Sequence, residues 1–178
     1  MAPKSHHTAV VVIPPETVWP SIQEIRRTHD RNVDRWMPHV TLLYPFLPPD
    51  RLGPAETALA PACARVAPFD ARLGEFRFFD HQSGRATIWL APEPRHAFIE
   101  LQSAVQACFP DYDDVSRHAA GFEPHLSVGQ ARSATAARAL VTDLQAVWRQ
   151  LVFPVDSIAV IRREGDGPFR LDRRVLLA

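Results

Sequence analysis

The sequence predicts an α+β fold of two lobes, in which two antiparallel-type β-sheets face a central cleft and helices pack outside. Two observations favour this class. The predicted elements occur twice in the order strand, helix, motif strand, helix, strand, and two near-identical apolar stretches occupy the motif position of each half. In addition, no glycine-rich phosphate loop follows a strand, as a doubly wound parallel sheet would need. We expect one domain over residues 1–178, with pseudo-symmetric lobes of roughly 1–83 and 84–178.

The first half begins with a buried strand, because residues 8–13 form a continuous β-branched run that two prolines end. Apolar residues at helical spacing then predict a helix over 16–29, followed by a polar loop. The remaining elements are a strand at 38–44, a helix at 54–66, and strands at 69–79 and 86–91 joined by a hairpin turn at 81–84.

The second half repeats this order. It contains a helix at 94–109, a polar loop, the second motif strand at 124–129, and a helix that Ser133 caps. Two final strands are expected at 152–162 and 169–177, because a glycine-rich turn at 164–168 separates them.

The two motif strands carry the residues that point to chemistry. PHVTL at 38–42 and PHLSV at 124–128 each place a histidine two residues before a hydroxyl residue within an apolar run. On a strand, such side chains leave the same face roughly 6.5–7 Å apart. Two such strands facing each other would surround a small anion with two imidazoles and two hydroxyls: His39, Thr41, His125 and Ser127.

A histidine two residues before a hydroxyl is a short pattern that arises by chance. The chain has two further copies, His6–Thr8 at a strand edge and His81–Ser83 in a polar turn. Only the copies at 39 and 125 share the preceding proline and the apolar neighbours. The alternative is that these are ordinary histidines of two strands.

Composition limits the classes of ligand. The 20 Lys and Arg residues balance 20 Asp and Glu residues, which argues against a surface that coats long nucleic acids and favours a small or terminal phosphate. The histidines and the cysteines Cys63 and Cys108 show no zinc-site spacing, and two cysteines make no disulfide framework. With no apolar signal core and no membrane-length run, we expect a cytoplasmic protein without a membrane segment.

The paired motifs PHVTLLYPF and PHLSVGQ, in a duplicated α+β chain, resemble the 2H phosphoesterase superfamily over nearly the whole length. The resemblance implies a metal-independent enzyme without a cofactor that opens 2′,3′-cyclic phosphates or cleaves 2′-5′ linkages. It also implies that His39, Thr41, His125 and Ser127 are the catalytic tetrad.

The residue types suit that reaction. Cleavage of a phosphodiester by in-line attack needs a base for the nucleophile and an acid for the leaving oxygen, and two histidines near neutral pH can share these roles. The sequence does not assign the roles between His39 and His125. Thr41 and Ser127 would donate hydrogen bonds to the non-bridging oxygens.

Weaker candidates for substrate contact flank the motifs. Trp36, Tyr44 and Phe46 are aromatic and could stack on a base, although core packing is the alternative for each. Arg163 could bind phosphate, as could the other arginines near the last turn. Neighbouring residues of a strand point to opposite faces, so at most one of Arg162 and Arg163 faces the cleft. Arg170 and the loop residue His118 are the remaining candidates for substrate contact.

These observations favour a phosphodiesterase acting on a small nucleotide or an RNA 3′ end, expected to be monomeric. Two alternatives stay open at this point. One is a non-catalytic module that binds an AMP-like nucleotide, and the other is 2′-5′ ligation of RNA by the reverse reaction in the same site.

Overall fold

The computed structural model describes residues 3–81, 83–118 and 120–178, which form eight strands and four α-helices. Two short 3₁₀ turns, η1 (Glu16–Val18) and η2 (Pro49–Arg51), add to them. In chain order the main elements are β1 (Thr8–Val12), α1 (Trp19–His29), β2 (Val40–Leu43), α2 (Ala55–Cys63), β3 (Phe69–Asp80), β4 (Ala86–Glu93), α3 (Arg95–Cys108), β5 (Leu126–Ala131), α4 (Ala134–Val147), β6 (Leu151–Val155), β7 (Ser157–Arg162) and β8 (Arg170–Leu176).

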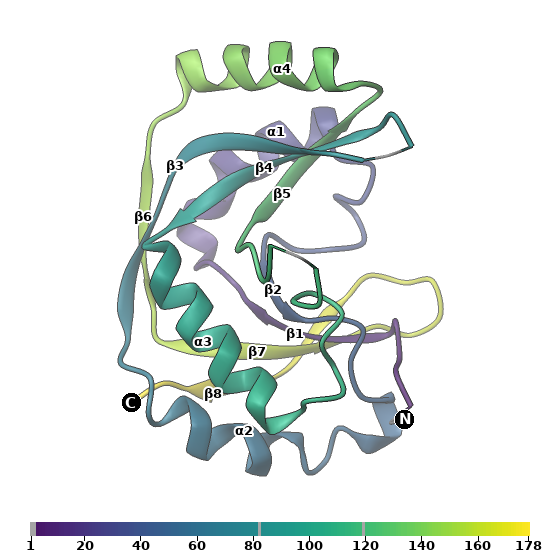
Figure 1. The fold of residues 1–178 in the computed structure, drawn as a ribbon, viewed down its shortest axis with the longest axis vertical. Coiled ribbons are helices and arrows are strands. Elements are labelled where there is room, and N and C mark those ends of the chain that lie inside the picture. Colours follow the sequence, from purple (N-terminus) through teal and green to yellow (C-terminus); the bar gives the residue numbers. More distant parts are fainter. Residues whose placement is uncertain (1–2, 82, 119) are drawn as a thin grey trace.

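The strands form two four-stranded sheets in which every pairing is antiparallel. The first sheet has the order β2-β1-β7-β8 and the second the order β5-β4-β3-β6. In Figure 1 α4 lies above the second sheet, while α3 and α2 lie beside and below the first. These observations confirm the α+β class with two antiparallel sheets.

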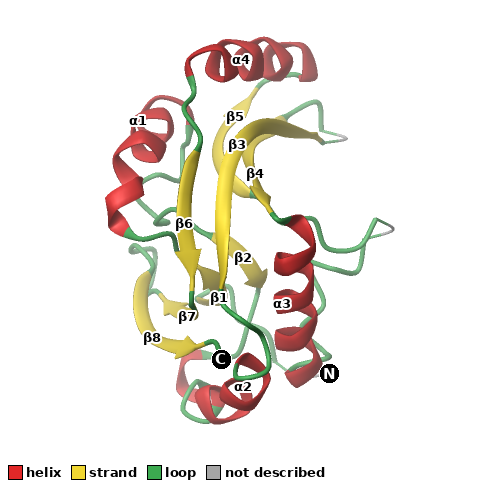
Figure 2. Cartoon of the chain, turned by 90° about the vertical axis from the view of Figure 1, so that its left-hand side faces the viewer, coloured by secondary structure: helices red, strands yellow, loops and turns green. Residues whose placement is uncertain are grey.

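The two sheets do not coincide with the sequential halves 1–83 and 84–178. The first sheet combines β1 and β2 with β7 and β8 from the C-terminus, and β3 joins three later strands in the second sheet. The expected single strand at 152–162 is two strands, because the chain passes at Asp156 from β6, which pairs with β3, to β7, which pairs with β1 (Figure 2). The polar residues Asp156 and Ser157 separate the two apolar segments at the point where the chain changes sheet, and the single expected strand ran across them.

Other local predictions are confirmed. The side-chain oxygen of Ser133 accepts a hydrogen bond from the backbone N–H of Ala136 at 3.1 Å and caps α4. β3 and β4 are the two arms of the hairpin expected at 81–84, of which Gln82 lies outside the described residues.

Both motif strands lie at sheet edges, β2 in the first sheet and β5 in the second. The helix that precedes each motif strand packs against the motif strand of the other sheet, α1 against β5 and α3 against β2. This exchange brings β2 and β5 into contact with each other. Among the helices of the described residues, none is long and apolar enough to cross a membrane.

Candidate active site

Strand alternation brings the histidine and the hydroxyl of each motif to one side of its strand. The middle residues, Val40 and Leu126, are fully buried at 0 % exposure. His39 and Thr41 flank Val40, and His125 and Ser127 flank Leu126. All four flanking side chains are partly exposed. The arrangement is the one that the i, i+2 spacing predicts. No hydrogen bond within the described part of the chain engages the hydroxyl of Thr41 or Ser127, so both are available to a ligand.

Each motif histidine forms a hydrogen bond with the backbone carbonyl group two residues earlier. His39 Nδ1 lies 2.7 Å from the carbonyl oxygen of Met37, and His125 Nδ1 lies 2.8 Å from that of Glu123. A carbonyl oxygen can only accept a hydrogen bond, so Nδ1 carries the hydrogen and donates it in both residues. The two neutral imidazoles therefore share one tautomer, in which Nε2 has a free lone pair.

His39 and Ser127 line the same cavity, which has a volume of about 220 Å³. Thr87 of β4 also lines it. His125 and Thr41 are not among the lining residues, but β2, which contains Thr41, contacts β5, which begins directly after His125. The cavity thus joins the histidine of one motif to the hydroxyl of the other. It is smaller than the roughly 300–1,000 Å³ of a pocket for a drug-sized ligand, and a phosphate group with part of a sugar suits it.

A buried ion pair at the end of α1 forms one wall of this cavity. Arg26 Nε donates to Asp30 Oδ2 at 2.8 Å, and the two residues are only 2 % and 5 % exposed. Gln130 of β5 donates to Asp30 Oδ1 at 3.0 Å and accepts from the backbone N–H of Arg31 at 3.1 Å. This network fixes α1 against the second motif strand. Sequence analysis missed it, although Arg26 lies four residues after Ile22 on the buried face of the helix.

Gly129 allows the close contact between α1 and β5. A Cβ atom at position 129 would lie 2.7 Å from His29 Cβ and 3.1 Å from the His29 carbonyl oxygen. Real Cβ atoms do not approach other atoms so closely. Glycine follows the second motif because the end of α1 lies against its backbone.

The site lowers the pKa of both histidines. The pKa of His39 falls from its usual 6.5 to about 4, chiefly because burial disfavours the charged ring, and the positive charge of Arg26 lowers it further. Burial also lowers the pKa of His125, whereas its hydrogen bond to the Glu123 carbonyl and the negative charge of Glu123 oppose that change. Asp30, the ion-pair partner of Arg26, raises the pKa of His39, and Arg95 forms an ion pair with Glu123 beside His125, so each ring has neighbours of both signs.

Trp36 packs directly against His39. Its ring stacks on His39 at 4.7 Å between centroids and 19° between planes, and on Phe169 at 3.8 Å and 26°. Two rings this close and nearly parallel to the indole would clash with each other if they shared one face, so they cover opposite faces. Tyr44 meets the indole edge-on at 5.2 Å. Trp36 also lines the cavity with His39 and Ser127, so contact between Trp36 and a substrate base stays a prediction.

A second Trp–Phe pair lies beside His125. Phe79 and Trp89 stack at 4.7 Å and 26°, and His125 meets them edge-on at 5.0 and 6.0 Å. Trp89 is the cross-strand neighbour of Ser127 and is 3 % exposed. Sequence analysis missed this pair, because strand pairing and not sequence spacing brings it to the histidine. Each motif imidazole thus packs against a stacked Trp–Phe pair.

The other candidate contacts have different outcomes. Phe46 is wrong as a substrate contact, since it is 0 % exposed and packs edge-on against Phe109 in the core. Tyr44 is partly exposed, and its role stays a prediction. The guanidinium of Arg163 lies 5.5 Å from the ring centroid of Phe169, on the Trp36 side of the sheet, and substrate binding by Arg163 also stays a prediction.

Three other candidates lie away from this cavity. Arg162 forms an ion pair with Asp172 at 3.2 Å, and Arg170 is exposed at the start of β8. His118 lies in the loop before β5 and does not line the cavity.

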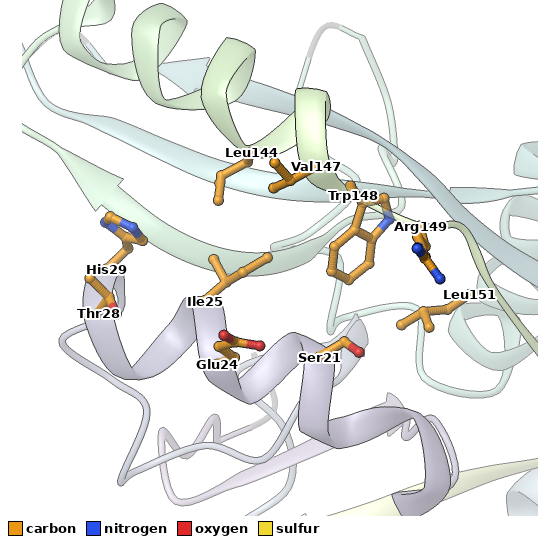
Figure 3. A pocket seen from close by; sticks show the side chains of 10 residues that line it. All are labelled: Ser21, Glu24, Ile25, Thr28, His29, Leu144, Val147, Trp148, Arg149 and Leu151. Carbon is orange, nitrogen blue, oxygen red and sulfur yellow. The ribbon is translucent and has the colours of Figure 1, made fainter.

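A larger cavity of about 560 Å³ lies between α1 and the end of α4 and contains none of the motif side chains. Figure 3 shows Ile25 of α1 facing Leu144 and Val147 of α4, with Trp148 beside them. The wall of this cavity mixes aliphatic residues with polar ones such as Glu24 and His29, but only the smaller cavity contains motif side chains, so we focus on the smaller cavity. Within the described residues, no three His, Cys, Asp or Glu side chains are grouped to hold a metal ion.

Comparison with known proteins identifies the family. The family model of the 2′-5′ RNA ligase superfamily matches residues 14–167. Comparison with curated protein sequences finds no match.

Solved structures share the fold. The protein TT0787 of Thermus thermophilus is 21 % identical with a TM-score of 0.64, over 96 % of this chain and 97 % of that one. E. coli LigT complexed with phosphate is 16 % identical with a TM-score of 0.59, over 99 % of each chain. A structure described as a phosphoesterase is 16 % identical with a TM-score of 0.61, over 98 % and 99 %. With the family model spanning both histidine motifs, the chain belongs to the 2′-5′ RNA ligase superfamily, which confirms its resemblance to the 2H phosphoesterases.

Proposed function

We propose that this protein is a metal-independent phosphodiesterase that opens 2′,3′-cyclic phosphates, or cleaves 2′-5′ linkages, of nucleotides or RNA ends. The observation that carries the proposal is that the two motif histidines have the same hydrogen-bonding arrangement and the same tautomer. Both donate Nδ1–H to a backbone carbonyl and keep Nε2 available for proton transfer, and His39 lines a cavity of phosphate size together with Ser127 of the other motif.

The reaction on a 2′,3′-cyclic phosphate needs two proton transfers. One neutral imidazole takes a proton from water at Nε2 while the water oxygen forms a bond to phosphorus. The bond from phosphorus to O3′ breaks, and the second histidine, protonated at Nε2, gives its proton to that oxygen. The product is a 2′-phosphate with a free 3′-hydroxyl. The base then releases its proton to water and the acid takes one up, which restores both histidines.

The surroundings of the two rings support one assignment of base and acid. Burial lowers the pKa of His39 to about 4 and keeps the ring neutral at pH 7, as a base requires, while the charges of Arg26 and its partner Asp30 act on it in opposite directions. His125 lies beside Glu123, whose negative charge favours protonation, and a bound phosphate anion raises its pKa further. We therefore assign His39 as the base and His125 as the acid.

Thr41 and Ser127 would bind the non-bridging oxygens. Their hydroxyls lie on the same side of the strands as the histidines, and donors placed in this way stabilise charge that develops in the transition state. Structures of E. coli LigT with 3′-AMP, ATP and NADP⁺ support a nucleotide as the ligand class. We further propose a cytoplasmic monomer without a cofactor, in keeping with the free thiols of Cys63 and Cys108.

The first test is hydrolysis of 2′,3′-cyclic AMP in excess EDTA by the wild type, His39→Ala and His125→Ala. The matched control is His96→Ala, which removes an exposed histidine of α3. We expect turnover to 2′-AMP by the wild type and the control and its loss in both motif variants. Saturable AMP binding without turnover would instead indicate a nucleotide-binding module, and joining of RNA ends without hydrolysis would indicate a ligase.

A diester with 4-nitrophenol as leaving group tests the assignment of base and acid. This leaving group needs no proton, so His125→Ala should recover turnover on it, whereas His39→Ala should stay inactive. Recovery by His39→Ala alone would reverse the assignment.

A further inference from the structure

Thr87 of β4 adds a hydroxyl residue to the cavity of the candidate active site. It lines this cavity together with His39 and Ser127, whereas Thr41 does not. Thr87 lies two residues before Trp89, the cross-strand partner of Ser127, so both hydroxyl residues leave the same face of the second sheet. The side chain of Thr87 is partly exposed, so a ligand at Ser127 can also reach Thr87.

The hydroxyl of Thr87 has a hydrogen-bond partner that does not line the cavity. His81 Nε2 lies 2.8 Å from Thr87 Oγ1, and His81 itself is exposed. The turn between β3 and β4 holds the backbone of His81. Its N–H donates to the carbonyl oxygen of Arg85 at 2.8 Å, and its own carbonyl oxygen accepts from the N–H of Gly84 at 2.9 Å. Among the described residues no other hydrogen bond engages the Thr87 hydroxyl, so the direction of its hydrogen depends on His81.

The position of the hydrogen on the His81 ring decides what Thr87 offers to a ligand. A neutral imidazole carries its hydrogen on one ring nitrogen and accepts at the other. If Nε2 has no hydrogen, it accepts the single hydroxyl hydrogen of Thr87, and only lone pairs remain for the ligand. If Nε2 carries the hydrogen, His81 donates to Oγ1 and the hydroxyl hydrogen of Thr87 is free to bind the ligand. The non-bridging oxygens of a phosphodiester only accept hydrogen bonds, so they select this second arrangement.

We propose that Thr87 donates a hydrogen bond to a non-bridging oxygen of the substrate phosphate beside Ser127, and that His81 positions this hydroxyl by donating Nε2–H to Thr87 Oγ1. The inference rests on the proposed function and assigns to it a further catalytic residue, Thr87, and a positioning residue, His81. A hydroxyl that accepts one hydrogen bond donates a stronger one, so the two bonds reinforce each other. The alternative is that the bond between His81 and Thr87 only closes the hairpin.

The role of Thr87 is tested by kcat/KM on 2′,3′-cyclic AMP and by the affinity for 2′-AMP. Thr87→Val keeps the shape of the side chain and removes its hydroxyl, and Thr57→Val, at an exposed position of α2, is the matched control. We expect Thr87→Val to lower both quantities by about tenfold or more, as for one lost hydrogen bond to a charged group. Thr87→Ser, which keeps a hydroxyl, should retain most of both, and melting temperatures show that the variants fold. Values for Thr87→Val equal to those of the control would overturn Thr87 as a donor.

The role of His81 is tested with two variants that differ in the hydrogen bond they can form. His81→Gln can donate an amide N–H to Thr87 Oγ1, whereas the ionised carboxylate of His81→Glu can only accept the Thr87 hydrogen. A bond that only closes the hairpin is possible in both variants, but only the donor leaves the hydroxyl hydrogen free for phosphate. The new carboxylate also repels phosphate directly, and His81→Glu in the Thr87→Val background measures that effect alone.

We expect His81→Gln to retain most of the wild-type kcat/KM. His81→Glu should lower kcat/KM about tenfold more when the Thr87 hydroxyl is present than in the Thr87→Val background, because it then also withdraws a donor from the phosphate. Equal losses in the two backgrounds would overturn His81 as a positioning residue. A loss in His81→Gln as large as that in His81→Glu would overturn it as well.

Binding of 2′-AMP separates this inference from the proposed function. If the wild type binds 2′-AMP but does not turn over 2′,3′-cyclic AMP, the phosphodiesterase proposal fails. Weaker binding of 2′-AMP by Thr87→Val than by Thr57→Val would then still support the contact between Thr87 and phosphate. If the wild type neither binds 2′-AMP nor turns over the cyclic substrate, both proposals fail.

Discussion

Replacing His39 with glutamine should change how the stability of the protein depends on pH. Above pH 6.5 the imidazole is neutral in both the folded and the unfolded chain, so its titration contributes nothing. Between pH 6.5 and about 4 the unfolded chain binds a proton at His39 that the folded chain does not bind. The free energy of unfolding of the wild type therefore falls as the pH falls through this window.

The size of the effect follows from the lowered pKa. A change from 6.5 to about 4, at about 1.4 kcal/mol for each pKa unit, gives a loss of about 3 kcal/mol. The ring of His39 is partly exposed, so this figure is an upper bound. The His39→Gln variant has no titrating group here and should lack this part of the acid sensitivity.

The assay is urea unfolding followed by tryptophan fluorescence at several values between about pH 7.5 and pH 4.5. The quantity to compare is the difference in unfolding free energy between the wild type and His39→Gln, which should shift in favour of the variant as the pH falls. The exposed His96→Gln variant should follow the wild type. If His39→Gln loses stability with acid in parallel with the wild type, the folded protein does not hold His39 neutral, and the reasoning for a base at this position fails.

Four other substitutions test the site. Ser127→Ala, and separately Thr41→Val, should lower kcat on 2′,3′-cyclic AMP by about 10²–10³-fold through loss of one oxyanion donor, and an unchanged kcat would exclude the hydroxyl from the transition state. Gly129→Ala forces a Cβ to 2.7 Å from His29 Cβ and should cost about 1–3 kcal/mol in urea unfolding, so a neutral result would mean that α1 shifts without penalty. Trp36→Ala should lower kcat by up to about tenfold with little change in KM, because a stacked ring pair contributes roughly 0.5–1.5 kcal/mol, and a rise in KM alone would indicate direct contact with substrate.

The repeated element order and the two motifs could be predicted because local patterns specify them. The β-branched run of β1, the cap at Ser133 and the exposed side of each motif strand depend only on nearby residues. The alternation of Val40 and Leu126 with their polar neighbours was enough to predict a shared face for each imidazole and hydroxyl.

Features made by distant pairing could not be predicted in this way. The break at Asp156 depends on which sheet receives each of the two apolar segments beside it. Phe79 reaches His125 only because β3, β4 and β5 are neighbours in one sheet. Phe46 and Trp36 are both aromatic residues beside a motif, but packing in the folded chain buries Phe46 in the core and stacks Trp36 on His39 and Phe169.

The carbonyl groups that hold the two imidazoles have a consequence for the pH–rate profile. Many catalytic histidines are oriented by a carboxylate, which itself gains a proton in acid and then releases the ring. Here the acceptors are the peptide carbonyls of Met37 and Glu123, which do not titrate, and no side-chain substitution can remove them. The orientation of both rings should therefore persist over the whole pH range in which the chain is folded, and each limb of the profile should report a proton at an Nε2 atom alone.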